Sequence, residues 1–195
     1  MTKVVIVVDT QADFMNADGA LSVAGADALA GPMADWLGRL DPVDTAAVLF
    51  TFDTHVRETY PASEEAKQFP IHCVRGEAGW HNVVAPETVA AGVPTYRLEK
   101  GVFAMWEETG LTVEPIDPPG TPQDRDAFFA ALRDKGVDEA VVVGVAADFC
   151  VRWAIDGLVA RGFRVTVPAA LTRGTARQID TVVAEDFAGQ AVMVR

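Results

Sequence analysis

Residues 141–158 read VVVGVAADFCVRWAIDGL, and this stretch decides what kind of fold the chain can adopt. A β-branched apolar run ends at Gly144, and a segment with apolar residues at helical spacing follows. A buried strand that leads into a helix is half of a β–α–β unit, the building block of parallel sheets. The thiol of Cys150 stands between the two, near the expected start of the helix.

The same alternation of strand and helix continues on both sides of this stretch. Strands are predicted at 3–9, 45–53, 94–100, 139–145, 163–171 and 190–195, and helices at 27–40, 124–136, 148–162 and 175–187. Two irregular segments are expected, the long 54–82 and the proline-rich 107–122. We predict an α/β fold: a doubly wound six-stranded parallel sheet with helices on both faces, as a three-layer sandwich. A chain of 195 residues is expected to form a single domain, 1–195.

Composition argues against several classes of partner. The chain has 16 Lys and Arg against 28 Asp and Glu, a net charge of −12, so no basic face is available for nucleic acid. No apolar run approaches the roughly 20 residues of a membrane span, and the N-terminal MTKVVIVVDTQ is typical of a buried strand rather than a signal peptide. Two cysteines cannot build a disulfide framework, which predicts a cytoplasmic protein.

Polar side chains follow four of the predicted strands. Open parallel sheets bind ligands outside the carboxyl ends of their strands, so these ends are where a site is expected. The residues found there are Asp9, the pair Asp53 and His55, Lys100, and Cys150. A nucleophile, a base and a cation at one edge of a sheet make the constellation of an active site.

Cys150 has the setting of a nucleophile. A helix N-terminus and a nearby Lys100 would lower the pKa of its thiol, and Asp9 could accept the proton. The unpaired N–H groups of the same helix end could bind an oxyanion. The alternative is a small buried hydrophobe, which is what most free cysteines are. Cys73 has no comparable setting and is interpreted as a bystander.

The segment 54–82 adds potential metal ligands. Asp53, His55, Glu65 and His72 offer nitrogen and oxygen donors suited to zinc, manganese or iron. Their spacing alone is a weak signal, because carboxylates and histidines in loops are usually solvated. His81 has no evident partners in the sequence.

Five motifs together resemble a known family, the isochorismatase-like cysteine hydrolases, and among them most closely the nicotinamidases. The motifs are DTQADF (9–14), DTH (53–55), EAKQFPIHCVRG (65–76), EKGVFAMW (99–106) and GVAADFCV (144–151). They occur in the family's order over nearly the whole chain. The resemblance implies a catalytic triad of Asp9, Lys100 and Cys150. It also implies a cis peptide between Val145 and Ala146, which would turn the Ala146 N–H, with that of Cys150, toward a substrate oxygen.

The resemblance further implies one divalent metal ion, Zn, Mn or Fe, that holds a pyridine nitrogen and ordered water. Its ligands would be Asp53, His55 and His72. Many relatives carry a second histidine shortly after the Asp-x-His pair, but this chain reads VRETY (56–60) there. Glu65 is therefore expected as the fourth ligand, with Glu64 as the fallback.

Other residues receive supporting roles. Aromatic side chains should flank a planar substrate, and Phe14, Phe69 and Trp106 are the candidates. Asp13 is expected to orient Lys100 or a loop, and Gln11 to brace the site. The segment 107–122 is expected to line the pocket or to contact another subunit of a homo-oligomer.

The expected reaction is hydrolysis of nicotinamide to nicotinate and ammonia through a thioester. The nearest alternative is another small-amide, ureido or carbamoyl hydrolase of the same superfamily. A nucleotide-binding module would need GxGxxG or GxxxxGK[ST] after the first strand, where this chain reads DTQADFM. An inactive relative is expected to lack one of the three triad residues, and all are present. The sequence leaves open whether the reaction serves NAD salvage or a degradative pathway.

Overall fold

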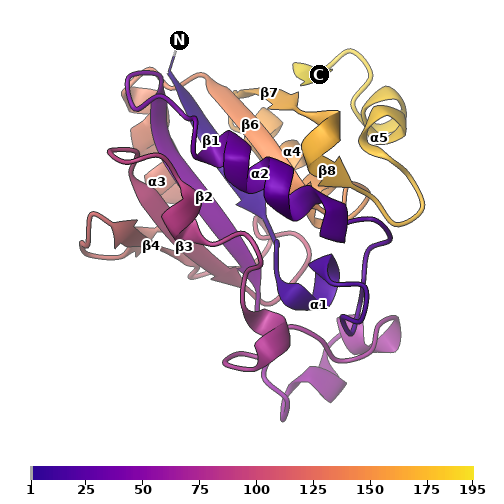
Figure 1. Ribbon diagram of the computed structural model, residues 1–195. Coiled ribbons are helices and arrows are strands. Elements are labelled where there is room, and N and C mark those ends of the chain that lie inside the picture. Colours follow the sequence, from indigo (N-terminus) through magenta and orange to yellow (C-terminus); the bar gives the residue numbers. More distant parts are fainter. Residues whose placement is uncertain (1) are drawn as a thin grey trace.

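A single mixed sheet runs through the computed structural model, which describes residues 2–195 (Figure 1). Its strands are β1 (Lys3–Val8), β2 (Thr45–Asp53), β3 (Thr95–Lys100), β4 (Thr112–Asp117), β5 (Gln123–Asp124), β6 (Glu139–Val145), β7 (Arg164–Val167), β8 (Thr172–Arg173) and β9 (Val192–Val194). The order is β5-β4-β3-β2-β1-β6-β7-β9, and β8 pairs with β6. The helices are α1 (Ala12–Met15), α2 (Ala30–Leu37), α3 (Arg125–Asp134), α4 (Cys150–Ala160) and α5 (Ile179–Asp186).

The six predicted strands are all present and parallel, as β1, β2, β3, β6, β7 and β9. In chain order they run 3-2-1-4-5-6 across the sheet, the doubly wound arrangement. The order reverses between β1 and β6, so a ligand site is expected beyond the carboxyl ends of these two strands. In Figure 1 these ends point toward α1 and the segment between β2 and β3.

Helices cover both faces of the sheet. On β1, Val4 and Ile6 share a core with α3, α4 and α5, whereas Val5 and Val7 pack toward α2 on the other face. Each of these four valine and isoleucine side chains is fully buried. Burial on both faces explains why β1 is continuously apolar and not alternating.

The segment 107–122 corrects one expectation. It was expected to be irregular because of its four prolines, but it forms β4, which pairs antiparallel with β3. Pro115 is tolerated because the outer neighbour of β4 is only the two-residue β5, so this part of the sheet is nearly an edge. The expected strand 163–171 also ends early, because Pro168 follows Val167 and a 3₁₀ turn, Ala169–Leu171, comes next. None of the helices in the described part of the chain has the length and apolar character of a membrane span.

Candidate active site

Cys150 is the first residue of α4 and lies just beyond the end of β6. The chain can approach β1 closely here because Gly144 has no side chain, and a Cβ on it would meet the Val8 carbonyl oxygen at 2.1 Å. Gly144 also has a φ of +112°, a conformation that side chains rarely adopt. The peptide between Val145 and Ala146 is cis, as the resemblance implied. Cys150 is 6% exposed, so a small molecule reaches its thiol only through a cavity.

Lys100 and Asp9 lie beside this thiol and are buried with it. The Lys100 Nζ atom is 2.8 Å from Asp9 Oδ2 and 3.4 Å from Cys150 Sγ. Lys100 is the last residue of β3, and Asp9 directly follows β1. The structure therefore brings together the three residues that the sequence singled out at separate strand ends.

Electrostatics around the thiol differ from the sequence-based expectation. Burial raises the pKa of the Cys150 thiol well above its usual value, and Lys100 only partly opposes this, since Asp9 and Asp53 raise it further. Burial also disfavours charge on Lys100, but Asp53 and Asp9 outweigh it and hold the Lys100 pKa well above its usual value. The expected lowering of the thiol pKa is therefore wrong for the resting protein. A neutral thiol faces an ammonium and a carboxylate, so it needs a base to become a nucleophile.

Two backbone N–H groups next to the thiol are free to bind an oxyanion. Within residues 2–195, the N–H groups of Ala146 and Cys150 donate no hydrogen bond. Both residues line the cavity described below. A tetrahedral intermediate requires free donors of this kind beside the nucleophile.

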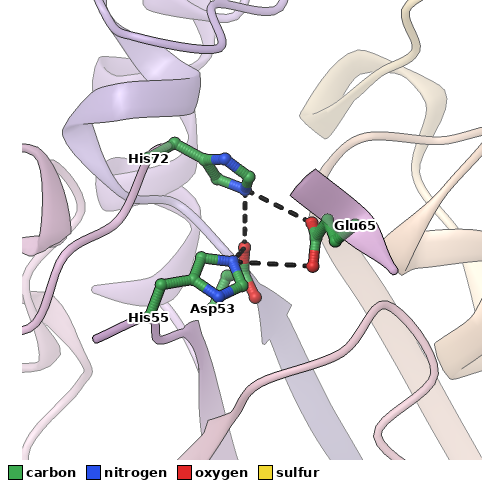
Figure 2. A group of neighbouring side chains, drawn as sticks. All are labelled: Asp53, His55, Glu65 and His72. Carbon is green, nitrogen blue, oxygen red and sulfur yellow. Dashed lines mark hydrogen bonds and ion pairs between the residues drawn. The ribbon is translucent and has the colours of Figure 1, made fainter. Parts of the chain in front are cut away.

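A second cluster lies beside the first and contains the four predicted metal ligands. One donor atom from each of Asp53, His55, Glu65 and His72 lies within 4.8 Å of the others, and all four residues are buried. Figure 2 shows their side chains converging from the end of β2 and from the segment that follows it. Nε2 of His72 is 3.0 Å from Asp53 Oδ2, and Nε2 of His55 is 3.1 Å from the same oxygen.

The donor set fits a divalent cation. Among residues 2–195, neither carboxylate oxygen of Glu65 has a hydrogen-bond partner although both are buried, and they lie 3.4–3.6 Å from the two histidine Nε2 atoms. His72 Nδ1 lies 2.8 Å from the Pro70 carbonyl oxygen, which can only accept, so Nδ1 carries a proton and Nε2 is the ring nitrogen that would give up its proton to bind a cation. Burial alone would lower the pKa of His72, but Asp53 and Glu65 outweigh it and raise that pKa to about 10. The site therefore favours positive charge.

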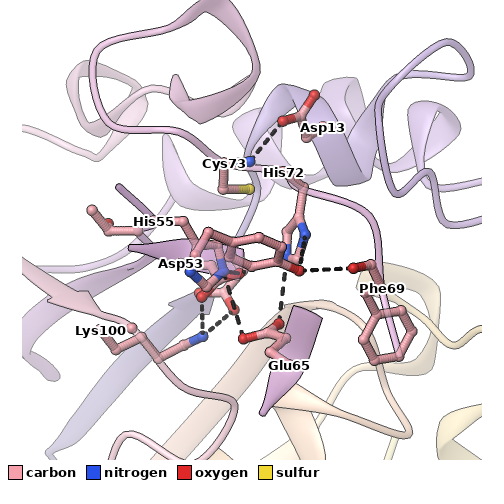
Figure 3. Close-up of polar contacts among 12 residues, drawn as sticks. Asp13, Asp53, His55, Glu65, Phe69, His72, Cys73 and Lys100 are labelled. Atoms are coloured by element: carbon pink, nitrogen blue, oxygen red, sulfur yellow. Dashed lines mark hydrogen bonds and ion pairs between the residues drawn. The ribbon is translucent and has the colours of Figure 1, made fainter. Parts of the chain in front are cut away.

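Asp53 links the two clusters. Its Oδ2 faces the two histidines, and its Oδ1 lies 3.5 Å from Lys100 Nζ (Figure 3). Burial disfavours its charge, but Lys100, His55 and His72 together hold the pKa of Asp53 well below its usual value. One carboxylate thus contacts both groups of side chains. These are the metal cluster of Asp53, His55, Glu65 and His72, and the thiol cluster of Asp9, Lys100 and Cys150.

The braces around these clusters were only partly foreseen. Gln11 donates to the Asp53 carbonyl oxygen at 2.7 Å and accepts from the Asp53 N–H at 2.8 Å, so it clamps this ligand's backbone. Asp13 accepts from the Cys73 N–H at 2.7 Å and so orients a loop rather than Lys100 (Figure 3). Tyr60 was missed: its ring packs against His55 at 4.7 Å, and no sequence motif marks it.

Cys73 and His81 take no part in either cluster. Burial and nearby carboxylates raise the pKa of the Cys73 thiol, which keeps it protonated. Its N–H is bound by Asp13, so the residue has a packing role. His81 is exposed, and its ring packs edge-on against Trp80 at 5.6 Å.

A cavity of about 310 Å³ opens onto the thiol. Aromatic rings dominate its wall, together with small residues of the cysteine motif; the lining residues are Phe14, Leu21, Ser22, Val23, Phe69, Phe103, Val145, Ala146, Phe149, Cys150 and Thr175. Phe14 and Phe69 lie in this wall, as predicted. Phe103 and Phe149 were missed, although both stand in quoted motifs. Phe69 contacts each of them edge-on, at 5.6 and 5.7 Å between ring centroids.

Trp106 was expected to flank the substrate, but it lies outside this cavity. Its indole N–H donates to the Trp153 carbonyl oxygen at 2.9 Å, and its ring packs on Phe129 of α3. The ring also covers Gly157 of α4, where a Cβ would meet it at 2.1 Å. Trp106 thus fills the gap between two helices.

Comparison with known proteins agrees with this architecture. No family model matches the sequence. Pyrazinamidase of Pyrococcus horikoshii, solved in complex with zinc, has a TM-score of 0.72 and 23% identity, and the match covers 100% of this chain and 99% of that one. N-carbamoylsarcosine amidase of Thermoplasma acidophilum also has a TM-score of 0.72, with 22% identity over 100% and 96% of the two chains. The fold is that of the isochorismatase-like hydrolases.

A relative with higher sequence identity shows which family within this fold the chain belongs to. The nicotinamidase/pyrazinamidase of Mycobacterium tuberculosis (strain ATCC 25618 / H37Rv) is 34% identical over 187 residues, which cover 93% of this chain and 91% of that protein. The chain therefore belongs to the nicotinamidase/pyrazinamidase family, and it is an amidohydrolase that acts on a carboxamide.

Proposed function

We propose that this protein hydrolyses nicotinamide to nicotinate and ammonia through a thioester on Cys150. The observation that carries the proposal is the contact of Lys100 Nζ with both Asp9 Oδ2 and Cys150 Sγ beside an aromatic-walled cavity. The identity to a nicotinamidase/pyrazinamidase supports the substrate. The two unpaired thiols suit the reducing cytoplasm, where we place the reaction.

The proposed steps use the side chains in one order. Asp9 takes the proton of the neutral Cys150 thiol, and the thiolate, held beside the Lys100 ammonium, attacks the carboxamide carbon. The N–H groups of Ala146 and Cys150 bind the oxyanion. Asp9 returns its proton to the departing nitrogen, and ammonia leaves a thioester. Asp9 then takes a proton from water as the water attacks the thioester, and it passes that proton to the departing Cys150 sulfur, which releases the acid and restores the thiol.

Asp53, His55, Glu65 and His72 would hold a divalent ion beside this pocket. When bound, the ion would supply a Lewis-acid contact for a ring nitrogen or a water molecule. Phe14 and Phe69 would contact a planar ring in the same pocket, either stacked on it or edge-to-face. The buried carboxylate of Glu65, which faces the Nε2 atoms of His55 and His72, supports Glu65, not Glu64, as the fourth ligand.

The alternative is another small-amide, ureido or carbamoyl hydrolase of the same superfamily. The fold alone does not choose, because an N-carbamoylsarcosine amidase shares it equally well. The metal-ligand cluster and the 34% identity favour the aromatic amide.

The test is release of ammonia and nicotinate from nicotinamide by the zinc-loaded protein. The variant Cys150→Ala should lose about 10³-fold or more of kcat, because the nucleophile is gone. Cys73→Ala makes the same change at the other thiol and should stay close to wild type. Equal activity of Cys150→Ala and wild type would refute the mechanism. Turnover of a different amide, but not of nicotinamide, would refute the substrate.

A further inference from the structure

Thr51 is a buried hydroxyl next to the thiol cluster that the steps above do not use. It is 1% exposed and lies on β2, where it pairs with Val8 of β1, the residue before Asp9. Side chains alternate along a strand, so Thr51 shares a face with Leu49, which packs in the core beneath α3 and α4. The strand therefore delivers the hydroxyl directly beneath the Asp9 carboxylate.

Two hydrogen bonds join Thr51 to Asp9. The Asp9 N–H donates to Thr51 Oγ1 at 3.2 Å, and the Thr51 hydroxyl donates to Asp9 Oδ1 at 2.6 Å. A hydroxyl has one proton to donate and two lone pairs, so both bonds can form together. Asp9 needs this support because its φ is +46°, a conformation uncommon outside glycine.

The two oxygens of the Asp9 carboxylate consequently have different surroundings. Oδ1 accepts the hydrogen bond of the Thr51 hydroxyl, whereas Oδ2 forms an ion pair with Lys100 Nζ at 2.8 Å. Asp9 is fully buried, so bulk water cannot compensate for a lost partner. The hydrogen bond thus fixes the rotation of the carboxylate plane about the Cβ–Cγ bond, with one oxygen toward Thr51 and the other toward Lys100.

We propose that Thr51 is a positioning residue that occupies Asp9 Oδ1 and so reserves Oδ2 for carrying the proton. The inference rests on the proposed function, in which Asp9 takes the proton of Cys150, gives it to ammonia and later deprotonates water. Every one of these transfers requires the same oxygen at the same place. Loss of such alignment can cost about 10²-fold in rate without weakening substrate binding.

The test compares three variants by ammonia release from nicotinamide. Thr51→Val keeps the shape and removes the hydroxyl, and its kcat should fall about 10- to 100-fold while KM stays within about threefold. Thr51→Ser restores the hydroxyl and should recover most of kcat. Thr45→Val makes the same change at another buried threonine of β2, far from Asp9 along the strand, and should behave as wild type. If Thr51→Val folds poorly, Thr51→Ala replaces it, and the same fall in kcat is expected.

An activated ester separates failure of this inference from failure of the proposed function. If wild type does not hydrolyse nicotinamide, the substrate proposal fails and p-nitrophenyl acetate decides the role of Thr51. With p-nitrophenyl acetate, the initial burst of nitrophenol reports acylation of Cys150, and the steady-state rate that follows reports attack of water on the thioester. Thr51→Val should slow the steady rate about 10-fold or more, and Thr51→Ser should not. Unchanged rates in Thr51→Val, or an equal loss in the serine variant, would overturn the inference.

Discussion

Glu64 and Glu65 are neighbours in the sequence, yet their surroundings are opposite. Glu65 is 7% exposed, and its carboxylate faces the Nε2 atoms of His55 and His72. Glu64 is exposed and pairs with Lys67 at 2.5 Å. Of the two, only Glu65 can reach a metal ion held by the histidines.

A glutamine scan of this pair tests the ligand set. Glu65→Gln should weaken zinc affinity about 10- to 100-fold, because a buried anionic donor becomes a neutral amide. Glu64→Gln is the matched control and should bind zinc as wild type does. Isothermal titration of the metal-free proteins measures both affinities. Equal weakening in the two variants would show that surface charge, not coordination, attracts the ion.

The site residues differ in how far the sequence could predict them. Asp9, Lys100 and Cys150 could be found because each follows an apolar strand, and parallel strands bring their carboxyl ends to one edge. The direction of the Cys150 pKa shift could not, because it depends on burial and on Asp53, which lies on another strand. Thr51 carries no motif at all, since a threonine inside an apolar strand is ordinary.

At the scale of elements, one aspartate ties the start of α4 to the connection between β8 and α5. Asp148 accepts hydrogen bonds from the backbone N–H groups of Thr175, Ala176 and Arg177, at 2.8–3.0 Å. It also accepts from the Thr175 hydroxyl at 2.9 Å. Because Thr175 lines the cavity, this clamp sets one wall of the pocket.

Asp148→Asn should destabilise the protein by about 1–3 kcal/mol at pH 7, because the amide group turns donors toward the donors of the loop. Burial tends to raise the pKa of Asp148, but the N–H groups of Arg177, Thr175 and Ala176 outweigh it and lower that pKa below 3.8. This stabilisation is therefore complete above the unfolded pKa and is lost as the pH falls through the folded pKa.

Urea unfolding at pH 7 and at pH 3 measures this effect. The difference between wild type and Asp148→Asn should shrink at the lower pH. Asp156→Asn, on the exposed side of α4, is the control and should change little at either pH. A difference that stays constant between the two pH values would contradict the clamp.

Elements could be predicted where a single pattern dominated. The apolar run of β1 and the capped helix α3, in which Asp124 accepts from the Ala127 N–H, follow from local sequence. The strand β4 could not be predicted, because its prolines argue against a strand until its place near the sheet edge is known.

At the scale of the whole molecule, folding gathers two carboxylates and two histidines into one buried cluster. Metal binding to the folded state should therefore stabilise it. At a free zinc concentration about 100-fold above Kd, the gain is about 2.7 kcal/mol. For a chain of this size, that corresponds to a rise in Tm of about 5–10 °C.

Thermal melts with a chelator and then with added zinc measure this shift. Magnesium at the same concentration is the control, because imidazole nitrogen is a poor ligand for it. A Tm that is the same in chelator and in zinc would show that the cluster does not hold a metal ion in the folded protein.

Asp53 has a consequence for how this chain can change over evolutionary time. Its two oxygens contact different groups: one faces the histidines, and the other faces Lys100. A lineage that abandoned the metal could discard His55 or His72 and keep a working thiol. It could not discard Asp53 without also rebuilding the surroundings of the lysine, so this position should be the last of the four ligands to drift.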